Sequence, residues 1–182
     1  MKSFFKIQVN PVLPSKKSDY KSIFKRAKNE FDPDIYSHAF CLIDLDYIHR
    51  NGKMDDYCAE KEDILKIKNM YVIESCPCIE YWFLLHYEYM FQSSYECSSI
   101  IDKLRLHIPD YKKNMQEIYE KICKFEQRAF NHSAKAKKQR QDDINHNIIR
   151  LKSPVTHTNV DELINFIKNN APKRYEKRLR QD

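Results

Sequence analysis

The run Phe40–Tyr47 (FCLIDLDY) constrains the fold most, because it is short, densely apolar and ends in two aspartates separated by one residue. An apolar run of this length between polar residues is typical of a buried inner strand of a parallel sheet. Alternation along such a strand would place the side chains of Asp44 and Asp46 on one side, roughly 6–7 Å apart. Two charges at that distance repel each other by roughly 2–3 kcal/mol. A divalent cation bound by both carboxylates would relieve this repulsion, and so would a neighbouring Lys or Arg.

The pattern on either side of this run predicts alternating strands and helices. The expected elements are an edge strand over 4–13, a helix from the cap Ser18-Asp19 to about Phe31, a strand over 39–46, a polar helix over 55–68, a strand over 70–75 and an apolar helix over about 78–91. This order favours the α/β class, with a parallel sheet, right-handed crossovers and flanking helices. We assign residues 1–92 to this core.

Residues 93–182 predict a helical, basic extension packed on the core. The expected helices cover about 95–106, 113–130 and 159–170, and the polar stretch 131–150 is either a solvated helix, which we favour, or a mobile segment. After residue 102 the chain holds 19 Lys and Arg against 10 Asp and Glu. This excess suits a polyanionic partner such as DNA or RNA, although solvated helices alone would also explain it. The candidate nucleic-acid contacts are Lys112, Lys113, Lys135, Lys137, Lys138 and Arg140.

Candidate site residues gather where the predicted strands end. In open α/β sheets, ligands bind beyond the carboxyl ends of the strands. Asp44 and Asp46 end one predicted strand, Glu74 and Ser75 end the next, and Glu80 lies in the first turns of the helix that follows. The N-terminal end of that helix favours anions such as phosphate. Ser75 is therefore either a contact to phosphate or metal or a plain helix cap.

Composition excludes several classes of protein. Gly52 is the single glycine, so neither a Walker A loop nor a dinucleotide-binding fingerprint is present, and any ATP must be bound by another polypeptide. The six cysteines form no C-x-x-C pair, and we expect them to be reduced and buried, as in a cytoplasmic protein. No apolar run reaches the length of about 18 residues that a membrane span needs, and no signal-peptide core follows Met1.

One long motif resembles a known family. Residues 75–87, SCPCIEYWFLLHY, are similar to the "SNPCFExWLLLHF" signature of RloB-like proteins, and Asp44-Leu45-Asp46 matches the D-x-D that precedes it there. Weaker matches are Pro109–Lys113, an alanine-bearing helix with Ala129 and Ala134, and Pro154-Val155-Thr156. The likeness covers roughly residues 4–170.

The resemblance implies a fold and a chemistry. RloB-like proteins are encoded near prokaryotic restriction and phage-defence loci, often beside an ABC-type or AAA-like ATPase, and they resemble the Toprim fold of topoisomerases, primases and related nucleases. It therefore implies a nuclease in which Asp44 and Asp46 hold Mg²⁺ or Mn²⁺ and in which Glu80, Ser75 and His86 belong to the catalytic site. On a helix, His86 would lie about 120° away from Glu80, so the two side chains would not share a face. The alternative to a catalytic role is therefore that His86 is a histidine buried in the core.

The sequence departs from the family pattern at its start. RloB-like chains begin with a strand that carries a glutamate in a "GxxTEpxYF" segment, and this sequence opens with Met1–Phe5 at the point where that segment should have passed. We expect either a late recorded start or a truncated chain, or else a degenerate member that is a catalytically inactive nucleic-acid-binding or regulatory subunit. Glu74 is a candidate substitute for the absent glutamate. Assembly as a homo-oligomer is left open.

Overall fold

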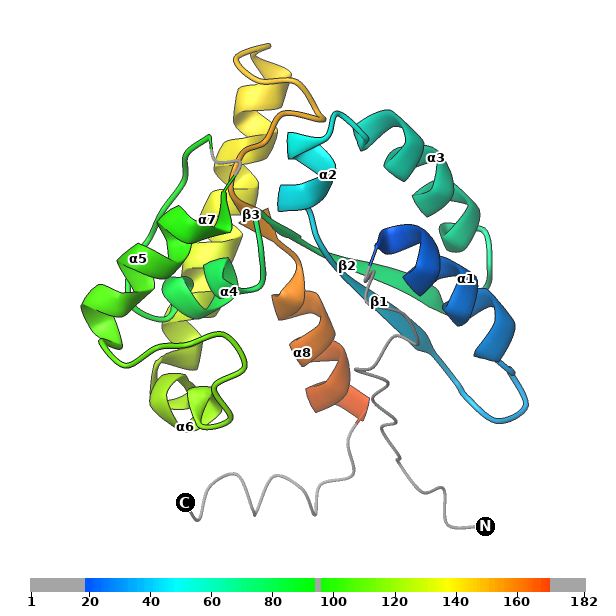
Figure 1. Cartoon of the computed structure of the whole chain (residues 1–182), viewed down its shortest axis with the longest axis horizontal. Coiled ribbons are helices and arrows are strands. Elements are labelled where there is room, and N and C mark those ends of the chain that lie inside the picture. Colours follow the sequence, from blue (N-terminus) through cyan, green and yellow to red (C-terminus); the bar gives the residue numbers. More distant parts are fainter. Residues whose placement is uncertain (1–18, 94–95, 171–182) are drawn as a thin grey trace.

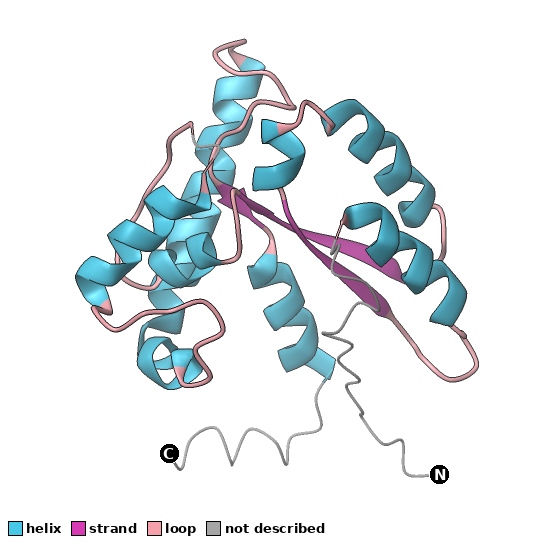
Figure 2. Cartoon of the chain, viewed as in Figure 1, coloured by secondary structure: helices cyan, strands magenta, loops and turns pink. Residues whose placement is uncertain are grey.

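A computed structural model of the chain describes residues 19–93 and 96–170, so the strand predicted over 4–13 lies outside the described residues. The described part is a small sheet with helices on both sides (Figures 1 and 2). The sheet has the strand order β1-β2-β3. Strand β1 (Ala39–Asp44) runs parallel to β2 (Met70–Cys76), with Ala39 opposite Met70 and Asp44 opposite Ser75. The α/β class with a parallel strand pair and flanking helices is confirmed.

The third strand was not predicted. Strand β3 (His157–Thr158) pairs antiparallel with β2, and two residues are too few to show any period in a sequence. Next to it, the side chain of Asn159 continues the ladder: its Oδ1 accepts a hydrogen bond from the N–H of Glu74, and its Nδ2 donates to the carbonyl of Val72. Strand β2 is therefore the middle strand of the described sheet, and β1 lies at its edge rather than inside it.

Helices α1 (Tyr20–Glu30) and α3 (Met54–Leu65) cover one face of the sheet. The helix α1 begins as predicted, because Oδ1 of Asp19 accepts a hydrogen bond from the N–H of Ser22 at 2.8 Å. The core on this face joins aromatic rings of the two helices to inward side chains of the strands: Tyr20, Phe24, Tyr57, Ile64, Cys41, Ile43, Val72 and Cys76. Inward residues at every second position of β1 give this face its apolar stripe.

The other face is covered by the second half of the chain. Helices α4 (Glu80–Leu85), α7 (Glu126–Asn145) and α8 (Val160–Asn170) pack a second core there, to which the sheet contributes Ile73 of β2 and the partly buried Phe40 of β1. A third cluster joins α5 (Cys97–His107) to α6 (Ile118–Ile122) through Leu104, Ile108, Tyr111 and Ile122. Residues beyond 92 thus supply both a strand and core side chains, while the domain boundary near residue 92 stays a prediction.

Several predicted boundaries were wrong. The strand over 39–46 ends at Asp44, and the helix over 78–91 is only six residues long. The helix over 113–130 is instead α6, a short 3-10 helix (Cys123–Phe125) and the first part of α7. The polar stretch after residue 130 is helical as far as Asn145, as the favoured interpretation expected. Within the described ranges, no helix is long and apolar enough to cross a membrane.

Candidate metal site at the ends of β1 and β2

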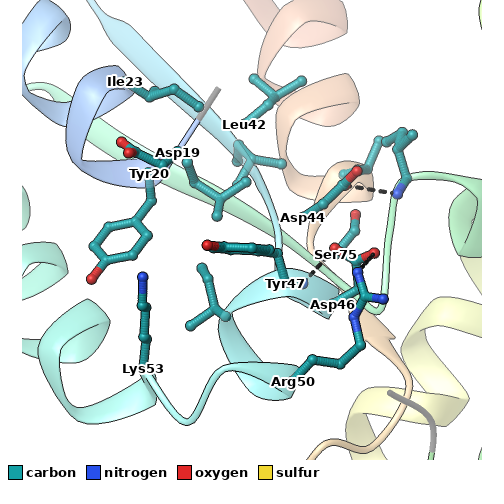
Figure 3. A pocket seen from close by; sticks show the side chains of 15 residues that line it. Asp19, Tyr20, Ile23, Leu42, Asp44, Asp46, Tyr47, Arg50, Lys53 and Ser75 are labelled. Atoms are coloured by element: carbon teal, nitrogen blue, oxygen red, sulfur yellow. Dashed lines mark hydrogen bonds and ion pairs between the residues drawn. The ribbon is translucent and has the colours of Figure 1, made fainter. Parts of the chain in front are cut away.

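A cavity of about 850 Å³ opens at the carboxyl ends of β1 and β2. Figure 3 shows Asp44, Asp46, Ser75 and Arg50 grouped at one end of it and Asp19, Tyr20 and Lys53 at the other. The remaining labelled side chains, Ile23, Leu42 and Tyr47, belong to the same lining. The crevice predicted from strand order therefore exists, and it is large enough for a small organic ligand or a nucleotide.

Asp44 is the last residue of β1, and its Oδ1 accepts a hydrogen bond from the N–H of Ile79 at 2.9 Å. Although its cavity side is exposed, the protein around the rest of the carboxyl raises the pKa of Asp44 to about 7, and the charge of Glu80 adds to this effect. The N–H of Ile79 and the charge of Lys113 act in the opposite direction. The carboxyl of Asp44 therefore keeps its proton up to about neutral pH, mainly because the surrounding protein disfavours its charged form.

Asp46 does not share a strand face with Asp44, which corrects the prediction from alternation. The chain leaves the strand at Leu45, which has helical φ and ψ, and Asp46 begins the short helix α2 (Asp46–Arg50). The N–H of Asp46 donates to the carbonyl of Pro77 at 2.9 Å, and its Oδ1 accepts from the N–H of Tyr47 at 2.6 Å. Its Oδ2 lies 3.5 Å from the guanidinium of Arg50, so a neighbouring cation does accompany this carboxylate.

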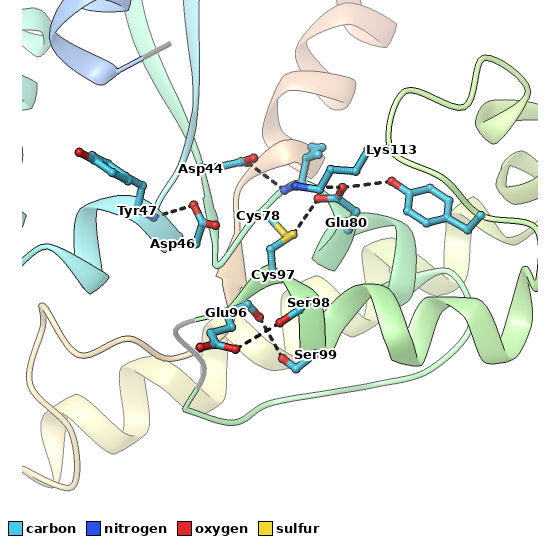
Figure 4. The surroundings of a disulfide bond; sticks show 12 residues. Asp44, Asp46, Tyr47, Cys78, Glu80, Glu96, Cys97, Ser98, Ser99 and Lys113 are labelled. Atoms are coloured by element: carbon cyan, nitrogen blue, oxygen red, sulfur yellow. Dashed lines mark hydrogen bonds and ion pairs between the residues drawn. A yellow bond between two sulfur atoms is a disulfide. The ribbon is translucent and has the colours of Figure 1, made fainter. Parts of the chain in front are cut away.

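Glu80 is the first residue of α4, and its side chain is buried. Figure 4 shows its carboxylate beside Lys113 and a disulfide, on the side of the site that faces Asp44. The hydroxyl of Tyr111 donates to Oε1 at 3.1 Å, and Nζ of Lys113 lies 3.8 Å from the same oxygen. Oε2 lies 3.2 Å from Sγ of Cys97. The contacts of Tyr111 and Cys97 with Glu80 were not predicted, because no pattern in the sequence links either residue to Glu80.

The two residues predicted at the end of β2 point to opposite faces. Ser75 lines the cavity on the face of Asp44, and its hydroxyl shares a hydrogen bond with that of Thr158 at 2.9 Å. It does not cap α4, whose N-terminus has no side-chain cap. Glu74 lies on the other face, where it accepts from the hydroxyl of Tyr57 and pairs with Lys61, each at 2.6 Å. Glu74 is therefore not placed to substitute for a missing carboxylate beside Asp44.

His86 lies in the core rather than at the cavity. Its Nδ1 is 2.9 Å from the carbonyl of Trp82, and its ring meets the indole of Trp82 edge to face. Burial lowers the pKa of His86, which favours the neutral imidazole. The structure does not bring His86 together with the carboxylates, and this agrees with the core interpretation.

The predicted basic contacts are divided between the site, internal pairs and the surface. Lys113 belongs to the carboxylate site through Glu80. Three residues of α7 are engaged within the chain: Lys137 pairs with Asp161 and Glu162, Lys135 lies 4.0 Å from the centre of the Tyr89 ring, and the half-buried Arg140 donates to the carbonyl of Leu151. Lys112 and Lys138 are exposed.

The expectation that all six cysteines are reduced was wrong for two of them. Cys78 and Cys97 form a disulfide, with their Cα atoms 5.7 Å apart. The other four form no disulfide: Cys41 and Cys76 are buried as expected, Cys58 is half-buried, and Cys123 is exposed, contrary to the expectation. The pair is 19 residues apart in sequence and has no C-x-x-C spacing, so sequence reasoning had no signal for it.

The donor types fit a hard divalent cation, but in this structure the carboxylate oxygens of Asp44, Asp46 and Glu80 do not all lie within 4.8 Å of one another, so these side chains would have to move closer together to share one ion. Asp44, Asp46 and Glu80 supply carboxylate oxygens, and Ser75 adds a hydroxyl beside Asp44. Oxygen ligands of this kind suit Mg²⁺ or Mn²⁺. The cluster of Cys78, Glu80 and Cys97, whose ligand atoms lie within 4.8 Å of one another, does not offer a thiolate site in this state, because its two sulfurs are bonded to each other.

The raised pKa of Asp44 predicts how the stability of the metal-free chain depends on pH. The folded-state pKa of this carboxyl lies above the ordinary value of 3.8, so the folded chain binds more protons than the unfolded chain between the two values. The contribution of Asp44 to the free energy of unfolding therefore falls as the pH rises from about 4 to about 7, and it is constant above that. Asp44→Asn should remove this slope. In urea unfolding, the free energy of unfolding of the variant should exceed that of the wild type by an amount that grows as the pH rises from about 4 to about 7. Asp34→Asn, at an exposed turn, is the control that keeps the wild-type slope. Parallel pH profiles for wild type and Asp44→Asn would contradict the prediction.

Comparison with known proteins gives one match. A family model described as RloB-like protein matches residues 2–167. No curated protein and no solved structure matches the chain. The matched range contains every candidate ligand described above, and because it spans most of the sequence, the chain belongs to the RloB-like family.

Proposed function

We propose that this chain is a metal-dependent nuclease, or the nuclease subunit of a phage-defence or restriction-associated system, which acts on DNA or RNA with Mg²⁺ or Mn²⁺. The observation that carries the proposal is the position of Asp44 and Asp46 at one end of a cavity, with the buried carboxylate of Glu80 near enough to Asp44 for its charge to raise the pKa of that residue. The bound cation would polarise a phosphodiester and help to supply a hydroxide nucleophile.

The side chains around these carboxylates would position them. The N–H of Ile79 holds Asp44, and the hydroxyl of Tyr111 holds Glu80. Such partners orient ligand oxygens and keep them in place when a cation binds. The ammonium group of Lys113, on a side chain that is more than half exposed, would be available to a phosphate oxygen of the substrate.

The rest of the cavity suits a nucleic-acid strand. Arg50 and Lys53 line it and carry positive charge. The ring of Tyr47 is 48% exposed, with the ammonium group of Lys53 at 5.3 Å from its centre, and an exposed ring of this kind is a surface on which a base can stack. The chain has no glycine-rich phosphate loop of its own, so we also propose that a separate ABC-type or AAA-like ATPase supplies any ATP-dependent step.

A second candidate function is a catalytically inactive subunit that binds nucleic acid or regulates a partner. Two observations favour it: Arg50 already accompanies Asp46, and Lys113 already accompanies Glu80. These cations would compete with a metal for the same oxygens. An oligomer is also compatible with either function.

A cleavage assay separates the two functions. The chain and its Asp44→Ala/Asp46→Ala variant are incubated with labelled single- and double-stranded DNA and RNA in Mg²⁺ or Mn²⁺, with and without the ATPase encoded nearby. We expect metal-dependent cleavage by the wild type and a loss of about 100-fold or more in the variant, since each lost charged contact is worth roughly 1.5–3 kcal/mol.

The controls show what each result means. Asp55→Ala/Asp56→Ala, in the first turn of α3, changes the net charge equally and does not touch the cavity lining. Equal cleavage by wild type and the Asp44/Asp46 variant would refute the nuclease function, and so would the absence of cleavage with either metal and the ATPase present. In the second case, retained binding that weakens steeply as salt rises would support the inactive subunit.

A further inference from the structure

A disulfide lies directly against the candidate site. It joins Cys78, two residues before Glu80, to Cys97, the first residue of α5. Both cysteines are buried, and Sγ of Cys97 is 3.2 Å from Oε2 of Glu80 (Figure 4). The disulfide is thus in contact with one of the three carboxylates proposed to bind the metal.

The same short segment contacts or contains all three proposed ligand residues, through the backbone of Asp46, the carboxylate of Asp44 and the side chain of Glu80. Within residues 77–80, the carbonyl of Pro77 accepts from the N–H of Asp46, the N–H of Ile79 donates to Oδ1 of Asp44, and Glu80 supplies its own side chain. Cys78 lies in the middle of this segment, so its bond to α5 fixes the backbone that positions the three ligands. A covalent constraint of this kind raises affinity by reducing the ordering cost of binding.

The contact between Cys97 and Glu80 depends on the redox state of the sulfur. A disulfide sulfur carries no hydrogen, so in this structure Cys97 cannot donate to Oε2 of Glu80, and that oxygen stays available to a cation. After reduction, the S–H of Cys97 is a donor at hydrogen-bond distance from the same oxygen. That hydrogen bond would compete with a metal for Glu80.

The other cysteines indicate that the bond is reversible. Four of the six form no disulfide, including the exposed Cys123. Proteins that keep several free thiols are typical of reducing compartments, where disulfides are usually transient, catalytic or redox-sensing. A permanent structural disulfide is the expectation for an oxidising compartment, where an exposed free thiol is unusual.

We propose that Cys78 and Cys97 form a redox-active pair that sets the metal affinity of the carboxylate site, with tight binding in the disulfide form and weaker binding in the dithiol form. The inference rests on the proposed metal ligands of the preceding section. The reducing partner is a dithiol: one of its sulfurs attacks the Cys78–Cys97 bond to give a mixed disulfide, and its second sulfur then displaces the protein sulfur. The dithiol loses two electrons and two protons and becomes a disulfide, while Cys78 and Cys97 each become a thiol.

The test measures Mn²⁺ affinity and free thiols on the same full-length chain, before and after reduction with dithiothreitol and removal of the reagent. Thiols are counted under denaturing conditions, and Mn²⁺ binding is followed by electron paramagnetic resonance. Reduction should add two thiols and weaken Mn²⁺ binding about fivefold, the factor that a hydrogen bond of about 1 kcal/mol contributes. Reoxidation with oxidised glutathione, which takes up the two electrons and two protons and becomes two thiols as the Cys78–Cys97 bond forms again, should restore both values.

Two variants identify the cysteines responsible. Cys123→Ser, which removes the exposed free thiol, should respond to reduction like the wild type. Cys97→Ser cannot form the bond and keeps a donor beside Glu80, so it should bind Mn²⁺ weakly with and without dithiothreitol. Circular dichroism melting confirms that each variant is folded, and the wild-type comparison decides the question if Cys97→Ser is not.

The results that would refute the redox pair differ from those that would refute the metal site. Equal Mn²⁺ affinity in both redox states, with the expected gain of two thiols, would overturn the redox pair and leave the metal site in place. A thiol count that does not change on reduction would also overturn it. No Mn²⁺ binding in either state would overturn the metal site itself.

Discussion

Glu80→Gln is expected to weaken Mn²⁺ or Mg²⁺ binding by about 10- to 100-fold and to lower metal-dependent cleavage by at least as much. The substitution keeps the shape of the side chain and an oxygen that can accept from the hydroxyl of Tyr111, but it removes the charge beside Asp44. A lost contact to a charged group is worth roughly 1.5–3 kcal/mol, which gives this range. Isothermal titration with Mn²⁺ measures the affinity even if the chain has no activity on the substrates tested.

The matched control for this substitution is Glu88→Gln. Glu88 follows the same helix, pairs with Lys103 and His107 near the surface, and does not line the cavity. It should bind metal like the wild type, with a melting temperature close to it. If the two variants bind metal equally well, Glu80 is not a ligand, and the site would then consist of Asp44 and Asp46 alone.

The sequence predicted those helices and strands in which buried residues recur at regular intervals. The β1 and β2 strands and the α1, α3, α5 and α8 helices all carry regular apolar positions, and each was found within a few residues of its expected place. The errors fall where tertiary contacts decide. Helix α4 is short although the stretch after it is apolar, and β3 consists of two residues that are ordered by pairing with β2.

The candidate site could be predicted only in part, for a similar reason. Asp44, Ser75 and Glu80 are at the ends of recognisable elements, so strand order placed them at one edge of the sheet. The contacts of Tyr111 and Cys97 with Glu80 link residues 31 and 17 positions apart, and no local pattern records them. The strand predicted through Asp46 was wrong because the chain turns into α2 at Leu45, a change that a short apolar run does not reveal.

Leu104→Ala is expected to destabilise the chain by roughly 2–5 kcal/mol, the range for removing a buried leucine side chain. Leu104 is fully buried in α5, in the cluster that also contains Ile108, Tyr111 and Ile122. Because Tyr111 from this cluster donates to Glu80, the resulting cavity should also loosen the candidate site and weaken metal binding. Urea unfolding at fixed pH gives the change in free energy, and Mn²⁺ titration gives the effect on the site.

Leu106→Ala is a closely matched control, because it makes the same substitution two residues further along the same helix. The side chain of Leu106 is 77% exposed, so its removal should change the free energy of unfolding by no more than about 0.5 kcal/mol. The difference between the two variants therefore isolates burial from helix propensity, which changes equally in both. Similar destabilisation by both substitutions would mean that α5 does not present Leu104 to the core, and the placement of Tyr111 against Glu80 would lose its support.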